Sequence, residues 1–430
     1  MNVLEWKSND VLALRILEIS RALLLVAIAA SALYQLQRYS LFPFAATGRF
    51  ALFVGVLVLV SYARPRLITS IPTLIWCLAA TVAWAGVNTY LLFGPQLALA
   101  ATARFANVMI VAPLASVLFT DQKHIGQVFA VYVLVLTVAF LSMIYQYYGG
   151  TLEAIVGSYI AIRADLVRYM TVVGEPNVGG MVAVLGFIVG VTIPKRMIAS
   201  VIIAGVSVAF VVMTLSKAAL VGLALAVGML IFMPTKDRSR IISRSTISGL
   251  LGLTVLFCLG ANNYLITAFQ SVLGNIPGEP SVIGDLANRQ LGGGLSEVPV
   301  AGVEASSYHW RDAIGVLFGL SFGIAGSAAQ EILGSGVNVV LPHNSYMEMY
   351  LTGGIVMLGV MVILMANAFR RIVSDVLRSR RAEEQCALVC MTVLSCWMFV
   401  YPIIYEPATG ALFWSIIGYG NRLSHSKHED

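Results

Sequence analysis

Runs of about 20 consecutive apolar residues recur along the whole chain, and they constrain its fold more than any other feature. A helix of about 20 apolar residues crosses the hydrocarbon core of a bilayer. Charged residues make up only 11% of this chain and hydrophobic residues 59%, whereas soluble domains carry about a quarter charged residues. The sequence therefore predicts an all-α polytopic membrane protein.

We place about twelve such helices along the chain. A polar segment from about Ala268 to Pro342 lies between the ninth and the tenth, and Lys217 divides one very long apolar stretch into a predicted hairpin. The spans are expected at residues 11–36, 43–63, 68–93, 96–119, 125–147, 177–194, 197–215, 218–233, 247–267, 344–369, 386–403 and 407–420. The chain is thus divided into spans one to nine (1–267), a loop with an amphipathic helix over about 306–320 (268–342), and spans ten to twelve with a polar tail (343–430).

Lysine and arginine residues gather on one side of this arrangement. If the N-terminus is cytoplasmic, 17 of the 27 lie in cytoplasmic connections, six in outer connections and four within spans. Cytoplasmic connections of membrane proteins are rich in Lys and Arg. We therefore expect both termini in the cytoplasm and the long polar loop on the outer side. The five cysteines fall within apolar spans, which indicates neither a disulfide framework nor a thiolate metal site.

Most of the cations on the outer side lie in segments that also hold other polar or turn-forming residues. Three segments contain them: the stretch from Arg163 to Asn177, the hairpin Leu215–Ala218, and the long loop with Arg289 and Arg311. Such a cluster suggests an anionic ligand held at the bilayer surface. The alternative is ordinary solvation of loops, with some arginines reaching lipid headgroups. For each residue alone the alternative is simpler, and for the cations together both interpretations stay open.

The polar loop ends at Leu341-Pro342-His343-Asn344-Ser345-Tyr346, where a hydrophobic run toward Phe369 begins. A histidine can exchange protons near neutral pH and act as a general base. The positive end of a helix beginning here would favour the neutral imidazole that a base requires. The alternative is an interfacial histidine that anchors the helix together with Tyr346 and Tyr350.

In this order, the segments resemble the bacterial O-antigen ligase and O-antigen polymerase superfamily. The resemblance covers about residues 163–370, and its most specific part is His343-Asn344-Ser345-Tyr346 followed by Gly353-Gly354-Ile355. It implies a membrane glycosyltransferase with a largely helical fold in the bacterial inner membrane. Such an enzyme moves a glycan from a polyprenyl (undecaprenyl) diphosphate carrier to an acceptor hydroxyl at the periplasmic face. Lys217 stands where members usually carry an arginine, and it can neutralise a phosphate only as a point charge.

The resemblance implies catalytic roles for His343, Arg311 and Lys217. The residues expected to bind the diphosphate or the glycan are Arg168, Arg289 (as the alternative to Arg311), Arg163, Asn177, Asn344 and Tyr346. A diphosphate leaving group needs cations but no protonation near neutral pH, so neither a metal nor another cofactor is expected. The expected partners are the lipid-linked glycan, the acceptor glycan, the bilayer and other polysaccharide assembly proteins, and nucleic acid is not among them.

Three functions stay open on this sequence. A polymerase would join repeat units of a surface or extracellular polysaccharide, and a ligase would transfer finished polymer to lipid A-core or to a protein. We favour the polymerase, because nothing in the loop suggests recognition of a lipid A core or a protein sequon. A transporter or flippase of lipid-linked glycan would show internal repeats and broken helices with midplane charges. No repeat is visible, but charges within spans keep transport open, namely Arg15, Glu18, Arg21, Arg49 and Arg104.

Overall fold

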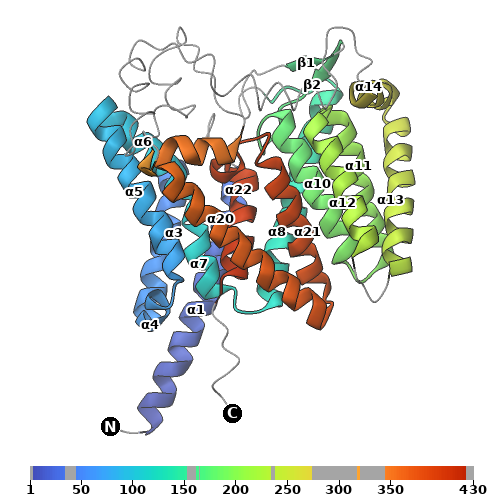
Figure 1. Cartoon of the computed structure of the whole chain (residues 1–430). Coiled ribbons are helices and arrows are strands. Elements are labelled where there is room, and N and C mark those ends of the chain that lie inside the picture. Colours follow the sequence, from blue (N-terminus) through green and yellow to red (C-terminus); the bar gives the residue numbers. More distant parts are fainter. Residues whose placement is uncertain are drawn as a thin grey trace.

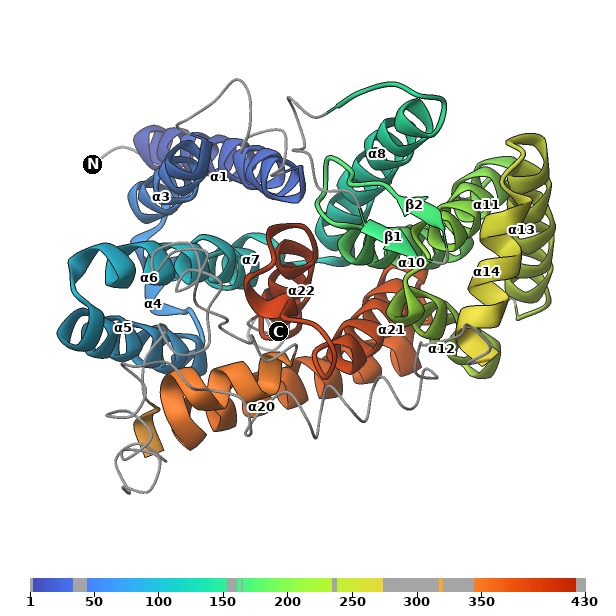
Figure 2. The ribbon, with the colours of Figure 1, turned by 90° about the horizontal axis from the view of Figure 1, so that it is seen from above.

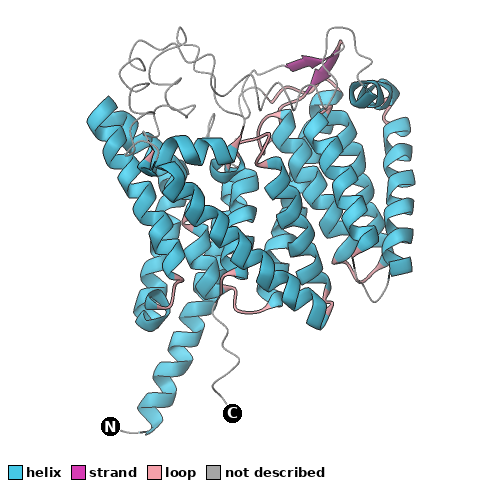
Figure 3. Ribbon diagram, in the orientation of Figure 1, coloured by secondary structure: helices cyan, strands magenta, loops and turns pink. Residues whose placement is uncertain are grey.

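A computed structural model describes the chain over residues 3–33, 45–152, 161–163, 165–233, 238–273, 317–319 and 344–422. These parts are mostly helical, with one pair of short strands (Figures 1 and 3). The elements are α1 (Val3–Ala32), α3 (Ala45–Ala63), α4 (Pro65–Thr69), α5 (Thr73–Phe93), α6 (Pro95–Met109), α7 (Val111–Leu118), α8 (Gln122–Tyr147), β1 (Ala161–Arg163), β2 (Leu166–Arg168), α10 (Pro176–Thr192), α11 (Met197–Thr214), α12 (Lys217–Phe232), α13 (Arg238–Cys258), α14 (Asn262–Leu273), α20 (Ser345–Ser379), α21 (Ala382–Trp397), η1 (Ile403–Tyr405) and α22 (Pro407–Gly420).

Six helical segments in these ranges are long and apolar enough to cross a membrane. They are Thr73–Leu91, Ala101–Leu118, Gln122–Tyr147, Met197–Thr214, Arg238–Cys258 and Thr352–Ser379. Three further apolar helices are shorter, at Arg49–Ala63, Pro176–Thr192 and Lys217–Phe232. The chain is therefore a helical membrane protein, while the number of twelve spans stays a prediction.

The helices form one bundle with two ends. The upper end, at the top of Figure 1, holds β1, β2 and the first turns of α20, and the lower end is where α1 begins and α22 ends. The antiparallel strands β1 and β2 pair with Ala161 opposite Arg168. The expected hairpin is present, because α11 ends at Thr214 and α12 begins at Lys217, with Leu215 in a left-handed conformation between them (φ 49°).

Helix α10 lies among α8, α11, α12 and α21 (Figure 2) and is buried along almost its whole length. Small residues permit this close packing. A Cβ atom on Gly180 would lie 2.7 Å from the Cβ of Ala219, and one on Gly190 would lie 2.8 Å from the backbone N of Ala204. The first turns of α10 are thereby held against the hairpin that carries Lys217.

The ninth span differs from the prediction of 247–267. Helix α13 begins at Arg238 and ends at Cys258, a turn at Gly260 follows (φ +69°), and α14 is a separate helix. The basic residues at the start of α13 were expected to lie in a loop. Instead the Arg244 guanidinium is buried and donates hydrogen bonds to the carbonyls of Val191 (3.0 Å) and Pro194 (2.7 Å). These carbonyls, one in the last turn of α10 and one just after it, provide the partners that a buried arginine needs.

Helix α20 bends where the sequence predicted one continuous run. Gly353 and Gly354 have non-helical backbone conformations, and Gly354 has φ +68°, which a residue with a Cβ rarely adopts. The short segment Leu317–Gly319 passes directly against this bend, since a Cβ on Gly354 would collide with the backbone of Leu317 and Gly319. The first turns of α20 therefore form a separate helical segment above the spanning part (Figure 1).

Candidate functional site

The structure describes five of the nine predicted site residues with their side chains, namely Arg168, Lys217, Asn177, Asn344 and Tyr346. His343, Arg289 and Arg311 lie outside the described residues, and of Arg163 only the backbone in β1 is described. All five described side chains belong to elements at the upper end: β2 and the beginnings of α10, α12 and α20 (Figure 1).

Arg168 connects the first predicted segment to the hairpin. It is the last residue of β2 and is half-buried. Its Nε donates to the carbonyl of Thr214 at 2.8 Å, and its Nη2 donates to Oδ1 of Asn177 at 2.8 Å. The Tyr264 hydroxyl on α14 donates to the carbonyl of Val167 at 2.7 Å, which holds the strand beside the helices. Two segments that are separate in sequence are thus joined by one guanidinium.

Lys217 is the first residue of α12, and its side chain is only 8% exposed. Ser216 caps this helix by accepting a hydrogen bond from the N–H of Ala219 at 3.3 Å. The helix dipole disfavours a cation at this position, and burial of the ammonium adds a desolvation cost. An anion bound here would be stabilised both by the ammonium and by the N-terminus of the helix. Lys217 and the first N–H groups of α12 therefore form a position that can hold an anion.

The start of α20 is fastened to the segment after α21. Asn344 caps α20 by accepting the N–H of Tyr346 at its Oδ1 (3.0 Å). Ser345 is fully buried; its N–H donates to the carbonyl of Met398 (2.7 Å), and its hydroxyl donates to the carbonyl of Tyr401 (2.8 Å). The Ser345 Oγ also accepts the N–H of Ile403 at 2.8 Å. These bonds fix the backbone that directly follows His343 in the chain.

Tyr346 holds the same junction together from its side chain. Its hydroxyl donates to the carbonyl of Ser395 at 3.1 Å, and its ring lies 4.6 Å from that of Phe399 between centroids. Burial raises the pKa of this hydroxyl. Because the hydroxyl is used by the backbone of α21, these contacts fit a positioning role for Tyr346 in addition to the predicted contact with substrate.

Tyr401 connects the segment that contains Glu175 and Asn177 to the segment that follows His343, and it is not among the residues predicted from the sequence. Its hydroxyl donates a short hydrogen bond to the Glu175 carboxylate, which precedes Pro176 and Asn177 at the start of α10. Its own carbonyl accepts the bond from Ser345. The signal that could have revealed it is the cluster of polar residues and prolines between the last two apolar runs, from Tyr401 to Pro407.

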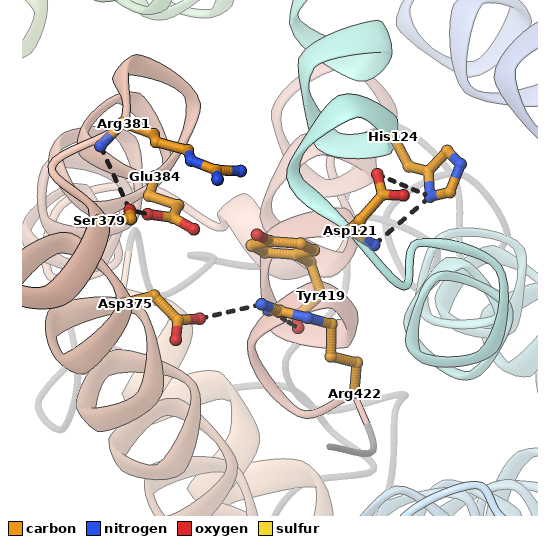
Figure 4. A network of polar contacts seen from close by, with 8 residues as sticks. All are labelled: Asp121, His124, Asp375, Ser379, Arg381, Glu384, Tyr419 and Arg422. Atoms are coloured by element: carbon orange, nitrogen blue, oxygen red, sulfur yellow. Dashed lines mark hydrogen bonds and ion pairs between the residues drawn. The ribbon is translucent and has the colours of Figure 1, made fainter. Parts of the chain in front are cut away.

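A second polar network lies at the lower end and is distinct from this site (Figure 4). Arg422 pairs with Asp375 at 2.9 Å and lies over the ring of Tyr419, 3.8 Å from its centroid. Asp121 and His124 form the capping box of α8. His124 is the single histidine within the described ranges, and its role in a helix cap at the opposite end makes it a structural residue.

Comparison with known proteins adds no identification: no family model matches the chain, and a search of curated proteins finds no match. The resemblance to O-antigen ligases and polymerases therefore depends on the quoted motifs and on how the described residues bring them together.

Proposed function

We propose that this protein is a membrane glycosyltransferase that moves a glycan from a polyprenyl diphosphate carrier to an acceptor sugar hydroxyl. One observation carries the proposal: segments far apart in the chain, which resemble the motifs of one glycosyltransferase superfamily, are joined directly at one end of the bundle. Arg168 joins the Asn177 segment to the hairpin that carries Lys217. Tyr401 joins Glu175 to Ser345, two residues after His343.

The chemistry follows from the charges of these side chains. Arg168 and Lys217, with Arg311 or Arg289 from the long loop, neutralise the diphosphate and stabilise the charge that develops on it as it leaves. His343 accepts the proton of the acceptor hydroxyl while that oxygen forms a bond with the anomeric carbon. The bond between this carbon and the diphosphate oxygen breaks, and the lipid diphosphate leaves as the anion. Arg163, Asn344 and Tyr346 complete the surface around the glycan.

The location of the reaction follows from the distribution of Lys and Arg. Because 17 of the 27 lie in connections assigned to the cytoplasm, we place both termini there and the upper end at the periplasmic face of the bacterial inner membrane. Strand β2, which ends at Arg168, and helix α12, which begins at Lys217, both meet this upper end (Figure 1). These are two of the cations that the charge rule leaves on the outer side. A lipid carrier in the outer leaflet would present its diphosphate at this level.

Among transferases, we propose the polymerisation of repeat units of a surface polysaccharide. Deletion of the gene distinguishes the products: a polymerase deletion leaves single repeats on the surface or on the carrier, and a ligase deletion leaves long polymer that is not attached to its acceptor. Complementation with the wild-type gene is the control. A deletion strain whose surface glycans and carrier-linked glycans both match the parent strain would overturn the proposal.

A further inference from the structure

A buried carboxylate lies in the connection between α21 and α22. Glu406 directly precedes Pro407 at the start of α22 and is 6% exposed. No described residue donates a hydrogen bond to its Oε1 atom. A buried polar atom without a partner costs about 1–3 kcal/mol, and more when it is charged. Native proteins keep few such atoms, and a bound ligand is one reason to retain one.

The neighbours of Glu406 come from other helices. Burial raises the pKa of its carboxyl, the positive charge of Arg104 on α6 opposes this rise, and Glu175 adds to it. A hydrogen bond from the backbone of Ala408 and the charge of Arg49 on α3 oppose the rise more weakly. The packing agrees with this proximity, because a Cβ on Gly410 in the first turn of α22 would lie 2.8 Å from Cγ1 of Val108 on α6. Two arginines that the sequence placed within apolar spans are therefore near enough to Glu406 for their charges to act on it.

Two more buried polar atoms, on the helices that meet here, lack a hydrogen-bond partner within the described part of the chain. Oδ1 of Asn107 lies on α6, three residues after Arg104, and Oγ1 of Thr409 lies on α22, three residues after Glu406. Residues three apart share a face of a helix, and α6 packs against both η1 and α22. Polar atoms with unused hydrogen-bonding capacity thus come from both elements that meet here.

The same connection adjoins the site described above on its other side. Tyr401, five residues before Glu406, carries the bonds to Glu175 and to Ser345. Seen from above, α6 and α12 lie on opposite sides of α22 (Figure 2). Helix α6, which carries Arg104, and helix α12, which begins at Lys217, therefore flank α22 from opposite sides. The groups that act on one another here include two acidic side chains, Glu406 and Glu175, beside the basic Arg104 and Arg49, and this mixture suits a neutral ligand rather than a diphosphate.

We propose that Glu406, together with Arg104 and Asn107, binds hydroxyl groups of the acceptor sugar, as a subsite separate from the one for the diphosphate. A carboxylate accepts hydrogen bonds from hydroxyl groups, a guanidinium donates them, and an amide does both. A neutral polyhydroxylated ligand would supply donors to the unpartnered oxygens of Glu406 and Asn107. This inference rests on the proposed function, because an acceptor sugar is present only if the protein transfers glycans.

The test is the acceptor dependence of transfer by purified full-length protein in lipid nanodiscs. The donor is the lipid-linked repeat unit extracted from gene-deleted cells, and the acceptor is the same oligosaccharide, released by mild acid and fluorescently tagged at its reducing end. Glu406→Gln keeps the size of the side chain and replaces one carboxyl oxygen with an amide nitrogen, which cannot accept a hydrogen bond. We expect KM for the tagged acceptor to rise about 10-fold, the effect of losing one hydrogen bond at a buried group. KM for the donor should stay within twofold of the wild-type value.

Glu384→Gln is the matched control, since Glu384 is also buried (4% exposed) but lies in the lower network. It should leave KM for the acceptor unchanged. If Glu406→Gln lowers the yield of folded protein, Asn107→Ala and Thr409→Val test the same subsite without changing the buried carboxyl. Asn107→Ala should then raise KM for the acceptor.

Failure of the inference and failure of the proposed function give different results. If the wild type transfers the glycan and Glu406→Gln or Asn107→Ala leaves KM for the acceptor within twofold, or raises only that for the donor, the acceptor subsite is wrong and the transferase proposal stands. If the wild type transfers no glycan and undecaprenyl diphosphate does not raise its thermal unfolding temperature, the proposed function fails and the inference fails with it.

Discussion

The hydrogen bond between Tyr401 and Glu175 is the link on which the convergence of the motifs depends most, so its removal is a direct test. Tyr401→Phe deletes one hydroxyl that donates to a carboxylate. The ring stays in place, and the carbonyl of residue 401 still accepts the bond from Ser345. Because a hydrogen bond to a charged group contributes about 1.5–3 kcal/mol, we expect the free energy of unfolding to fall by about 2 kcal/mol.

A double-mutant cycle with Glu175→Gln isolates this contact. Each variant and the double variant are unfolded in mixed micelles, and the transition is followed by tryptophan fluorescence. If the two groups interact directly, the double variant should lose about 1–2 kcal/mol less than the sum of the single losses, because the second substitution removes a bond already broken. Substitutions at independent sites add to within about 0.5 kcal/mol.

Tyr264→Phe provides the control for loss of a tyrosine hydroxyl at the same end of the bundle. Its hydroxyl donates to the neutral carbonyl of Val167, so we expect a loss of only about 1 kcal/mol, additive with that of Glu175→Gln. A stabilising contact between Tyr401 and Glu175 would be refuted if Tyr401→Phe were as stable as the wild type. It would also be refuted if the losses in free energy of unfolding of Tyr401→Phe and Glu175→Gln were additive.

Three further predictions concern the chemistry and the orientation. Lys217→Ala should slow transfer strongly in nanodiscs without loss of folded protein, and Lys217→Arg should keep substantial activity; a fully active Lys217→Glu would exclude phosphate binding there. His343→Ala and His343→Gln should each reduce the transfer rate by about 10² to 10⁴. The wild-type rate should fall as the pH is lowered through the pKa of the His343 imidazole, because the protonated imidazole cannot accept a proton. Near-normal turnover of His343→Gln with an unchanged pH profile contradicts the general base. Cysteines introduced at Ser281 and Ser306 should react with an impermeant thiol reagent in intact cells, whereas one at Ser374 should not, and labelling at Ser374 would reverse the orientation.

The class of this protein follows from its sequence, because the hydrophobicity of a span is a local property. The apolar runs and the polar junction at Lys217 are each contained within about 20 residues, the length over which a bilayer selects a helix. The charge bias is read from the connections between these runs. The hairpin between α11 and α12 is confirmed for this reason. The motif order that suggested a glycosyltransferase is also a property of the linear sequence, and the function derived from it stays a proposal.

Only the tertiary structure shows the features that depend on contacts between residues distant in sequence. Arg244 could enter α13 because carbonyls about 50 residues away accept its hydrogen bonds, and hydropathy alone placed this span too late. The bend in α20 depends on the approach of Leu317–Gly319 to Gly354. Tyr401 lies 226 residues from Glu175, and Glu406 is surrounded by residues from other helices. No pattern within a single helix contains these contacts, since each exists only after the helices have packed.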